Sequence, residues 1–276
     1  MTALRSNIHT HSTYADGRDA PEDMLRAALR LGFHTLGFSE HGRADYDDCA
    51  MPADVEPLYR ADILRLKAKY AGEIDVLLGY EHDWLSPPTP DRYDYIIESV
   101  HYLRAGGGFV CVDDTRDILT DAIDKHFGGD PYAMCREYFR TVAESCQSGA
   151  QVLGHMDLVM KFNERRDLFD DADSRYLKCA LEAADAAADS GMLIEINTGA
   201  IARGYRTQPY PGPAILRRLA ERGARIVVTS DCHNSDYLDC GFADAAALAL
   251  GCGFRTAWQY RGAQLEEYPL EDIVNG

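Results

Sequence analysis

The stretch MLIEINTGAIARGYRTQPYPGPAILRRLAERGARIVVTSDCH, residues 192–233, contains two apolar runs of strand length with a helical segment between them. The apolar runs are MLIEINTG and ARIVVTSDCH, and the predicted helix is PGPAILRRLAERG. Strands that alternate with helices are typical of a mainly parallel sheet. This stretch therefore predicts an α/β fold.

The same alternation extends over the rest of the chain. Further helices are predicted at 20–32, 54–72, 130–149, 171–191 and 236–251. Further strands are predicted at 4–11, 33–42, 74–84, 93–102 and 150–158. Since no low-complexity linker and no sequence repeat divides the chain, we expect a single domain over residues 1–276. A closed or partly closed α/β barrel is the economical arrangement, and a doubly wound open sheet is the alternative that strand counting leaves open.

Composition excludes several classes of function. A net charge of −17 argues against a nucleic-acid partner, which needs clustered Lys and Arg, but local arginines or metal ions can still bind a phosphorylated substrate. No apolar run is long enough for a membrane span, and the first residues do not predict a signal peptide. The eight cysteines form no Cys-x-x-Cys pair, so we expect reduced core thiols and a cytoplasmic protein. The acidic charge is compatible with a monomer or a homodimer.

Side chains that can bind metals gather at the carboxyl ends of the predicted strands. His9 and His11 form a His-x-His pattern, in which both imidazoles share one face of a short strand. In α/β barrels these strand ends build the active site, so residues distant in sequence converge there. Burying so many ionisable groups together would be costly without cations, and the set therefore predicts a site for several metal ions. In chain order, the set is His9, His11, Asp16, His41, Glu81, His101, His155, Asp157, Glu195, Asn197, Asp231 and His233.

Seven motifs occur in order along the chain: HTHSTYADG, FSEHG, GYEHDW, SVHYL, GHMDL, EINTGAIARGYRTQPYP and SDCH. Together they resemble the successive motifs of the polymerase and histidinol phosphatase (PHP) superfamily, and the middle ones are most similar to its histidinol-phosphatase branch. The resemblance implies a distorted (β/α)7 TIM-like barrel. It also implies two to three divalent metal ions, which are zinc, iron or manganese in this family.

The resemblance further implies how the metals are held. The first ion would be bound by His9, His11, Glu81 and Asp231. Glu81 would bridge to the second ion, which His101 and His155 would also bind. The third ion would be bound by Asp16, His41 and His233. Many relatives have a histidine near the position of Asp16, and in relatives of this Asp-Gly type a serine often replaces Ala15. The third metal site is therefore the one in which this chain departs most from the family.

The reaction implied by the resemblance is hydrolysis of a phosphomonoester, with L-histidinol phosphate in histidine biosynthesis as the first candidate substrate. Such a reaction needs a neutralised dianion and an activated water, which clustered divalent metals supply. We expect a hydroxide that bridges the first two metals to be the nucleophile. Glu81, Asp231 and His233 would act through the metals, while Asp157 and Glu195 would orient histidine ligands or protonate the leaving alkoxide.

Three arginines are candidates for binding the substrate phosphate through paired hydrogen bonds. Arg203 and Arg206 follow the predicted strand at 192–199, and Arg165 follows the one at 150–158. Solvated surface charge is the alternative interpretation for each of them.

Other functions remain open at this point. A PHP phosphoesterase for a nucleotide or an oligonucleotide end is the nearest alternative, although an exonuclease should show a Lys/Arg run and this chain has none. A non-catalytic metal-binding module would usually close its coordination sphere, whereas the second and third sites have three protein ligands each. An amidohydrolase would commonly supply a bridging lysine from a strand end, and no lysine stands at one here.

Overall fold

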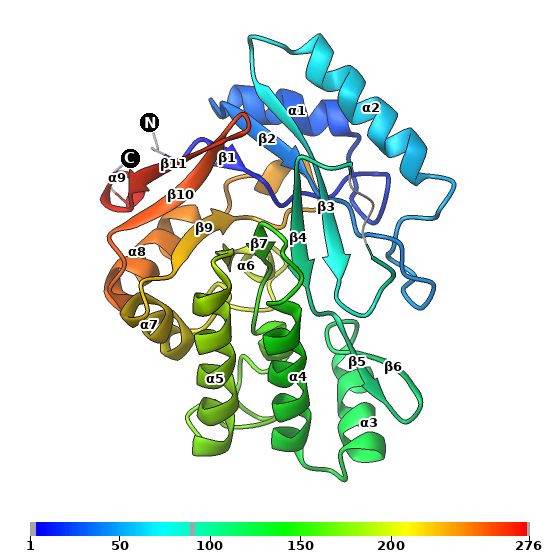
Figure 1. Ribbon diagram of the computed structural model, residues 1–276, viewed down its shortest axis with the longest axis vertical. Coiled ribbons are helices and arrows are strands. Elements are labelled where there is room, and N and C mark those ends of the chain that lie inside the picture. The colour runs from blue at the N-terminus through cyan, green and yellow to red at the C-terminus, as the bar shows by residue number, and fades with distance from the viewer. Residues whose placement is uncertain (1–3, 89–91, 275–276) are drawn as a thin grey trace.

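The computed structural model describes residues 4–88 and 92–274, and its central feature is a curled nine-stranded sheet (Figure 1). The strand order in this sheet is β1-β2-β3-β4-β7-β8-β9-β10-β11. The bounds are β1 Ser6–Asn7, β2 Thr35–Phe38, β3 Asp75–Asp83, β4 Tyr95–Ser99, β7 Val152–Leu153, β8 Leu193–Asn197, β9 Arg225–Thr229, β10 Thr256–Arg261 and β11 Gln264–Pro269. A separate antiparallel hairpin consists of β5 (Tyr102–Ala105) and β6 (Gly108–Cys111).

Seven parallel strands, β1 to β4 and β7 to β9, form the wall of a distorted barrel. The wall closes at its carboxyl end, where Thr10 beyond β1 makes a parallel bridge with Cys232 beyond β9 and the amide of His11 donates to the Cys232 carbonyl at 2.9 Å. At the opposite end β10 lies between β9 and β1. It pairs with β9, and the side-chain oxygen of Gln259 on β10 accepts a hydrogen bond from the backbone amide of Arg5. The predicted barrel is confirmed, and the open doubly wound sheet is excluded.

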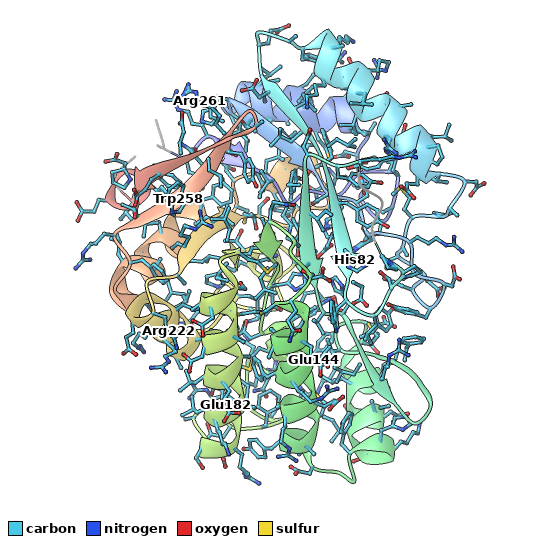
Figure 2. The ribbon with its side chains drawn as sticks, viewed as in Figure 1. His82, Glu144, Glu182, Arg222, Trp258 and Arg261 are labelled. Carbon is cyan, nitrogen blue, oxygen red and sulfur yellow. The ribbon has the colours of Figure 1, made fainter. Side chains whose placement is uncertain are left out.

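Helices surround the barrel wall, and Glu144, Glu182 and Arg222 lie in this outer layer (Figures 1 and 2). Their bounds are α1 Pro21–Arg30, α2 Glu56–Lys69, α3 Arg116–His126, α4 Pro131–Ser145, α5 Ser174–Ser190, α6 Gly199–Ala202, α7 Pro213–Glu221, α8 Phe242–Cys252 and α9 Glu271–Val274. Local chemistry sets several ends: the side chains of Asp130 and Asp173 accept from backbone amides at the starts of α4 and α5. None of the described helices is long and apolar enough to cross a membrane.

Several regions differ from the sequence-based expectation, among them the carboxyl-terminal hairpin β10–β11, which was not predicted. The segment between β4 and β7 contains the hairpin β5–β6 and helix α3, none of which the apolar pattern indicated, because three consecutive glycines and a polar helix carry little periodic signal. The strand predicted at 150–158 ends after Leu153, and a 3₁₀ turn follows at Leu158–Met160. The second half of that predicted strand is thus a loop at the carboxyl end of the barrel.

The strands divide their side chains between two cores. One set of alternate residues, including Val76, Leu78, Ile194 and Ile196, packs outward against the helices. The other set points into the barrel and forms a small apolar cluster of Ile8, Leu77, Tyr95, Ile97, Val152, Leu193, Val227 and Tyr260. Since alternation continues along each strand, the inward positions after this cluster are Glu81, Glu195 and Asp231. The same alternation along the strands therefore fills the barrel interior with apolar side chains and places ionisable side chains toward its carboxyl end.

Tyr95 fills the barrel where Gly37 and Gly79 leave room, and its hydroxyl donates to the carbonyl of Ile8. Replacing Gly79 with alanine is expected to lower the free energy of unfolding by about 1–3 kcal/mol, because overpacking forces neighbours off their preferred positions. The new Cβ would lie 2.2 Å from the Tyr95 ring. Denaturant unfolding monitored by circular dichroism measures this change.

The matched control for this variant is Gly251→Ala in α8, where the new Cβ would meet no other segment of the described residues within 4 Å. Alanine there should raise stability by about 0.5–1 kcal/mol through helix propensity. Equal unfolding free energies for the two variants would contradict the packing role of Gly79.

Candidate metal centre

The carboxylate of Glu81 lies among five imidazoles at the carboxyl end of the barrel. The distances to Oε1 are 3.1 Å from His155 Nε2, 3.3 Å from His9 Nε2 and 3.5 Å from His101 Nε2, and those to Oε2 are 2.9 Å from His41 Nδ1 and 3.5 Å from His11 Nε2. Two ligands bound to one ion at about 2.1 Å stand roughly 3–3.5 Å apart. The spacing around Glu81 is therefore that of ligands sharing metal ions.

Asp231 faces the same group from the loop that follows β9, two residues after the strand ends. Its Oδ1 lies 3.3 Å from His11 Nε2 and 3.8 Å from His9 Nε2, and these three residues form one possible metal-binding group. The backbone of Asp231 has a φ of 44°, a conformation that non-glycine residues adopt rarely and that is common at functional sites. In this backbone conformation the Asp231 carboxylate lies against the two histidines.

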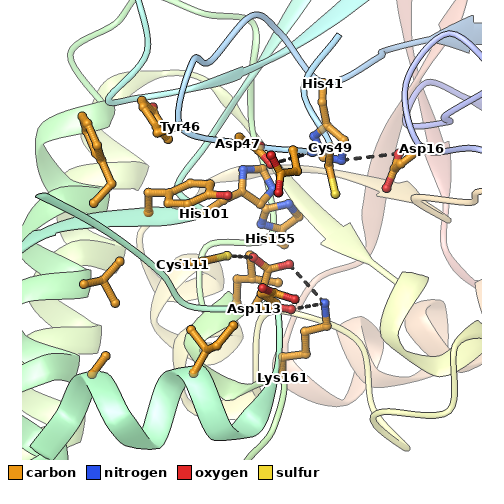
Figure 3. Close-up of a pocket in the computed structure, with 18 of the residues that line it drawn as sticks. Asp16, His41, Tyr46, Asp47, Cys49, His101, Cys111, Asp113, His155 and Lys161 are labelled. Atoms are coloured by element: carbon orange, nitrogen blue, oxygen red, sulfur yellow. Dashed lines mark hydrogen bonds and ion pairs between the residues drawn. The ribbon is translucent and has the colours of Figure 1, made fainter.

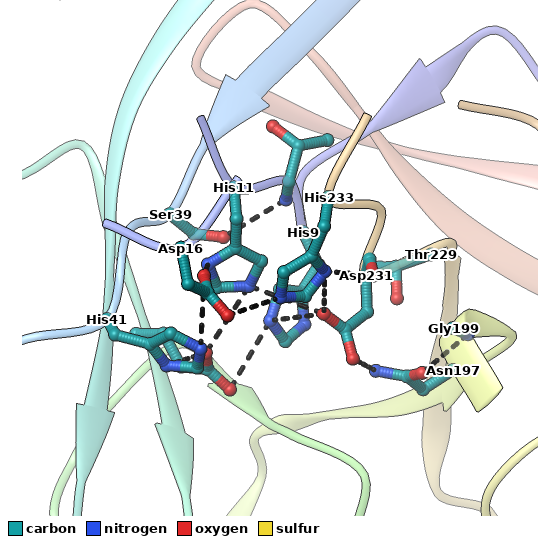
Figure 4. A network of polar contacts seen from close by, with 12 residues as sticks. His9, His11, Asp16, Ser39, His41, Asn197, Gly199, Thr229, Asp231 and His233 are labelled. Carbon is teal, nitrogen blue, oxygen red and sulfur yellow. Dashed lines mark hydrogen bonds and ion pairs between the residues drawn. The ribbon is translucent and has the colours of Figure 1, made fainter. Parts of the chain in front are cut away.

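A second possible metal-binding group lies at the outer edge of the cluster and contains Asp16, His41, His233 and His11 (Figure 4). Asp16 Oδ2 is 3.0 Å from His233 Nε2, and Asp16 Oδ1 is 3.8 Å from His41 Nε2. The His11 ring stacks against those of His41 and His233, with centroids 4.3 and 4.4 Å away, and the centroids of His41 and His233 are 6.3 Å apart. A third group, His41, Glu81 and His101, links this edge to the centre.

The residues fit divalent cations on two grounds. Buried atoms without a hydrogen-bond partner among the described residues include His9 Nε2, both ring nitrogens of His11, and Glu81 Oε2. Leaving such atoms unpaired is costly, and metal ions would satisfy them. The donor atoms in these groups are imidazole nitrogens and carboxylate oxygens rather than thiolates, and this combination of donors suits zinc, iron or manganese.

Electrostatics point the same way. Burial opposes ionisation of Glu81, but the surrounding histidines outweigh it and hold the pKa of that carboxyl well below its usual range. Burial likewise opposes protonation of His41, yet Glu81 and Asp16 raise its pKa to about 10. The carboxylates thus create a field that attracts positive charge, and bound cations would replace these protons.

Glu195 orients the innermost ligands from β8. The Nδ1–H of His9 donates to Glu195 Oε1, and the amide of His155 donates to Oε2 at 2.7 Å. Thr229 Oγ1 and Asn197 Nδ2 complete the set of donors to this carboxylate, at 2.6 and 3.0 Å. The bond to Nδ1 leaves His9 Nε2 directed at Glu81, an arrangement typical of carboxylates that support metal-bound histidines.

Replacing Glu195 with glutamine is expected to lower metal affinity or activity by about 10–100-fold, because the imidazole of His9 would lose its orientation and basicity. Metal content after dialysis and kcat/KM at saturating metal measure the two effects. Glu182→Gln, an exposed change of the same type on α5, is the control. Identical behaviour of the two variants would show that Glu195 has no orienting role.

Two further buried carboxylates support the cluster, and the sequence analysis missed both. Asp83 accepts from the His101 amide at 2.8 Å and from the Tyr46 hydroxyl at 2.7 Å. Glu40 accepts from the Ser12 amide at 2.9 Å and so holds the turn that carries Asp16. Each stands within two residues of a predicted ligand, and that proximity is the only signal that could have identified them.

The other residues selected from the sequence lie in different surroundings. Asp157 is buried and accepts from the Gly212 amide at 2.8 Å, and burial raises its pKa to about 6 despite the nearby Arg206. Arg206 is itself buried, donates to the Met160 carbonyl at 2.9 Å and lies over the Tyr210 ring. Arg165 is exposed. Of the three candidate arginines, Arg203 alone is among the described residues that line the cavity beside the cluster.

This cavity has a volume of about 720 Å³ and is strongly acidic (Figure 3). Besides ligand candidates, it is lined by five aspartates, Asp47, Asp48, Asp113, Asp114 and Asp121. Arg203 borders it beside the candidate metal ligands, with Nη2 donating to Asp231 Oδ2 at 3.1 Å and Nη1 lying 2.8 Å from His233 Nδ1. Lys161 and the aromatic residues Tyr46, Tyr102 and Phe109 also line the cavity, and the sequence did not single out Lys161.

Comparison with known proteins places this geometry in a family. Residues 7–199 match the PHP domain model. A Deinococcus radiodurans protein named "Probable histidinol-phosphatase" is 32% identical over 93% of this chain and 96% of its own length. The Bacillus subtilis histidinol-phosphatase is 25% identical over 90% of this chain and 99% of its own length.

The fold is also that of solved relatives. The crystal structure of histidinol phosphate phosphatase from Lactococcus lactis, complexed with zinc, L-histidinol and phosphate, superimposes with a TM-score of 0.70 at 20% identity, over 95% of this chain and 98% of the other. The barrel predicted from the sequence is thus confirmed. The chain belongs to the PHP domain family, in its histidinol-phosphatase branch.

Proposed function

We propose that this protein is a metal-dependent phosphomonoesterase that hydrolyses L-histidinol phosphate to L-histidinol and phosphate. The observation that carries the proposal is the convergence of five imidazoles on the carboxylate of Glu81 at the open end of the barrel. The curated relatives named histidinol-phosphatase support the activity, and the zinc, L-histidinol and phosphate in the Lactococcus lactis structure support the choice of substrate.

The acidic cavity is an independent argument for this substrate. Two or three divalent ions would balance Asp16, Glu81 and Asp231. Of the five aspartates farther along the cavity, Asp113 and Asp121 are each paired with one lysine, Lys161 and Lys125, so the lining there keeps an excess of negative charge. L-Histidinol phosphate carries an ammonium and a protonatable imidazole behind its phosphate. A substrate with cationic groups behind the phosphate is therefore favoured over a sugar phosphate or a nucleotide.

The metals proposed are two to three divalent ions, zinc, iron or manganese. His9, His11, Glu81 and Asp231 would hold the first, Glu81, His101 and His155 the second, and Asp16, His41 and His233 the third. Bound ions would supply an activated water and neutralise the phosphoryl oxygens. Glu195 would keep the His9 ring in place throughout, and Asp83 would do the same for His101.

Arg203 would bind the phosphate. Its guanidinium is held by Asp231 and His233 at the edge of the cluster, so a cation with unused donors borders the cavity there. Arg206 and Arg165 stay outside this role in the proposal, since Arg206 is committed to the Met160 carbonyl and Arg165 is exposed. Asp157 would stabilise the loop that carries Gly212 rather than donate a proton to the leaving group.

The proposed setting is the cytoplasm. All eight cysteines are free thiols, which suits a reducing compartment. A monomer or a homodimer is proposed, with no nucleic-acid or membrane partner.

The test is phosphate release from L-histidinol phosphate beside a panel of nucleotides, sugar phosphates and other small phosphomonoesters. The protein is stripped of metal and reconstituted separately with manganese, iron, zinc and cobalt. The expected result is metal-dependent hydrolysis, with kcat/KM for L-histidinol phosphate at least about 10²-fold above the rest of the panel, as expected of a site built to pair with the substrate's polar groups. A higher kcat/KM for another compound in the panel would contradict the assignment of L-histidinol phosphate as the substrate, but it would not contradict the proposed metal site.

A further inference from the structure

Asp113 and Lys161 form an ion pair inside the cavity that the proposed reaction does not use. The two residues come from loops at the carboxyl end of the barrel, Asp113 from the turn between β6 and α3 and Lys161 from the end of the 3₁₀ turn after β7. Both line the cavity with His101, His155 and Arg203. The pair therefore stands where a substrate held at the metals would extend.

The hairpin β5–β6 fixes the position of Asp113. It begins directly after His101 and returns in register, with Tyr102 opposite Cys111. The amide of Val112 then donates to the His101 carbonyl at 2.9 Å. Asp113 directly follows Val112, so this hydrogen bond to the backbone of His101 also fixes the position of Asp113. Figure 3 shows Asp113 below His155 and next to Lys161.

Lys161 holds one side of this carboxylate. Its Nζ donates to the backbone oxygen of Asp113 at 2.6 Å and to Oδ2 at 3.1 Å. The ammonium lies 5.0 Å from the centroid of the Tyr205 ring and 5.6 Å from that of Phe162, so its position is enclosed. The side chains of Lys161 and Asp113 are only 12% and 21% exposed.

The other carboxylate oxygen is nearly free. Among the described residues, the partner of Asp113 Oδ1 is the Cys111 thiol, at 3.3 Å. A thiol is a weak donor, so a partly buried anionic oxygen bordering the cavity lacks a strong partner. An ion pair that served only to fasten two loops would need no such open acceptor, and its net contribution to stability would be small.

We infer that Asp113 and Lys161 determine specificity for phosphate esters of amino alcohols, with Asp113 Oδ1 accepting from the substrate ammonium and Lys161 positioning the carboxylate. In such a substrate four bonds separate the nitrogen from the phosphorus, and Asp113 lines the same cavity as Arg203, His101 and His155, so its carboxylate is the proposed partner of that ammonium. The inference rests on the proposed function, and it names the residues that would distinguish this substrate from phosphates without an amine.

The experiment compares L-histidinol phosphate with its des-amino analogue, 3-(imidazol-4-yl)propyl phosphate. In the metal-loaded wild type the amine compound should have the higher kcat/KM. Asp113→Asn should lower kcat/KM for the amine compound by about 10²-fold and that for the analogue by less than about threefold, because an ionic partner is lost only by the ammonium. Lys161→Met should reduce the same preference, since the carboxylate would lose its anchor.

Asp117→Asn is the matched control, an exposed aspartate on α3 that does not line the cavity, and it should leave both rates unchanged. Thermal unfolding and metal content of every variant identify any loss of folding. If the wild type is active and Asp113→Asn lowers kcat/KM by the same factor for both compounds, this inference is overturned and the proposed function stands. Wild-type inactivity on both compounds would overturn the proposed function and this inference with it.

Discussion

Glu81→Gln is expected to lower kcat/KM by at least about 10³-fold, because removing the charge that the first two proposed metal sites would share costs several kcal/mol of transition-state stabilisation. The carboxylate faces His9, His101 and His155 through Oε1 and the remaining two imidazoles through Oε2, so no neighbouring side chain can replace it. An amide keeps the shape but offers one neutral oxygen and one NH₂ donor, which would face imidazole nitrogens that also need a cation.

Steady-state kinetics at saturating metal and elemental analysis of the purified variant measure this effect. The variant should retain fewer metal ions per chain than the wild type. Glu73→Gln, an exposed change just before β3, is the control for the substitution itself. Activity within tenfold of the wild type would show that Glu81 does not bridge metals.

Chelation of the metals is expected to remove more than about 99% of the activity and to lower Tm by on the order of 10 °C. A ligand present at about 1,000 times its Kd stabilises the folded state by about 4 kcal/mol, and each kcal/mol corresponds to about 2–4 °C in a chain of this size. The structural reason is the burial of Glu81, Asp231 and Glu195 in one cluster, where cations offset repulsion between carboxylates.

Differential scanning calorimetry with and without chelator, followed by readdition of each metal, tests this expectation. The metal that restores both activity and Tm at the lowest free concentration identifies the preferred ion. An unchanged Tm in protein shown to be metal-free would contradict the claim that the cluster is held together by cations.

The sequence alone was sufficient for the barrel and for the residues that meet at its end. Helix-strand alternation predicted a parallel sheet, and parallel strands place their carboxyl ends on one edge. Side-chain alternation then determined which residues face inward, so that Leu77 and Leu193 fill the barrel while Glu81 and Glu195 contact opposite ring nitrogens of His9 at its mouth. These outcomes depend on local periodicity, and periodicity is readable in a single chain.

The sequence was a poorer guide to the residues around the substrate. Arg206 looked equivalent to Arg203, yet the packing of its loop turns it to the Met160 carbonyl, while Arg203 borders the cavity. Asp113 and Lys161 are separated by 47 intervening residues and belong to loops without periodic signal, so nothing in the sequence pairs them.

One physical cause separates the features that the sequence predicted from those that only the tertiary structure decided. Strand ends converge because backbone hydrogen bonding fixes the sheet, whatever side chains follow, and the sequence by itself therefore determined the fold and which ionisable side chains meet at the barrel mouth. Contacts between loops depend on how the inserted hairpin β5–β6 and helix α3 pack against the barrel mouth, through individual side-chain contacts that follow no repeat. Only the tertiary structure could decide which charges line the cavity, and hence which substrates it would accept.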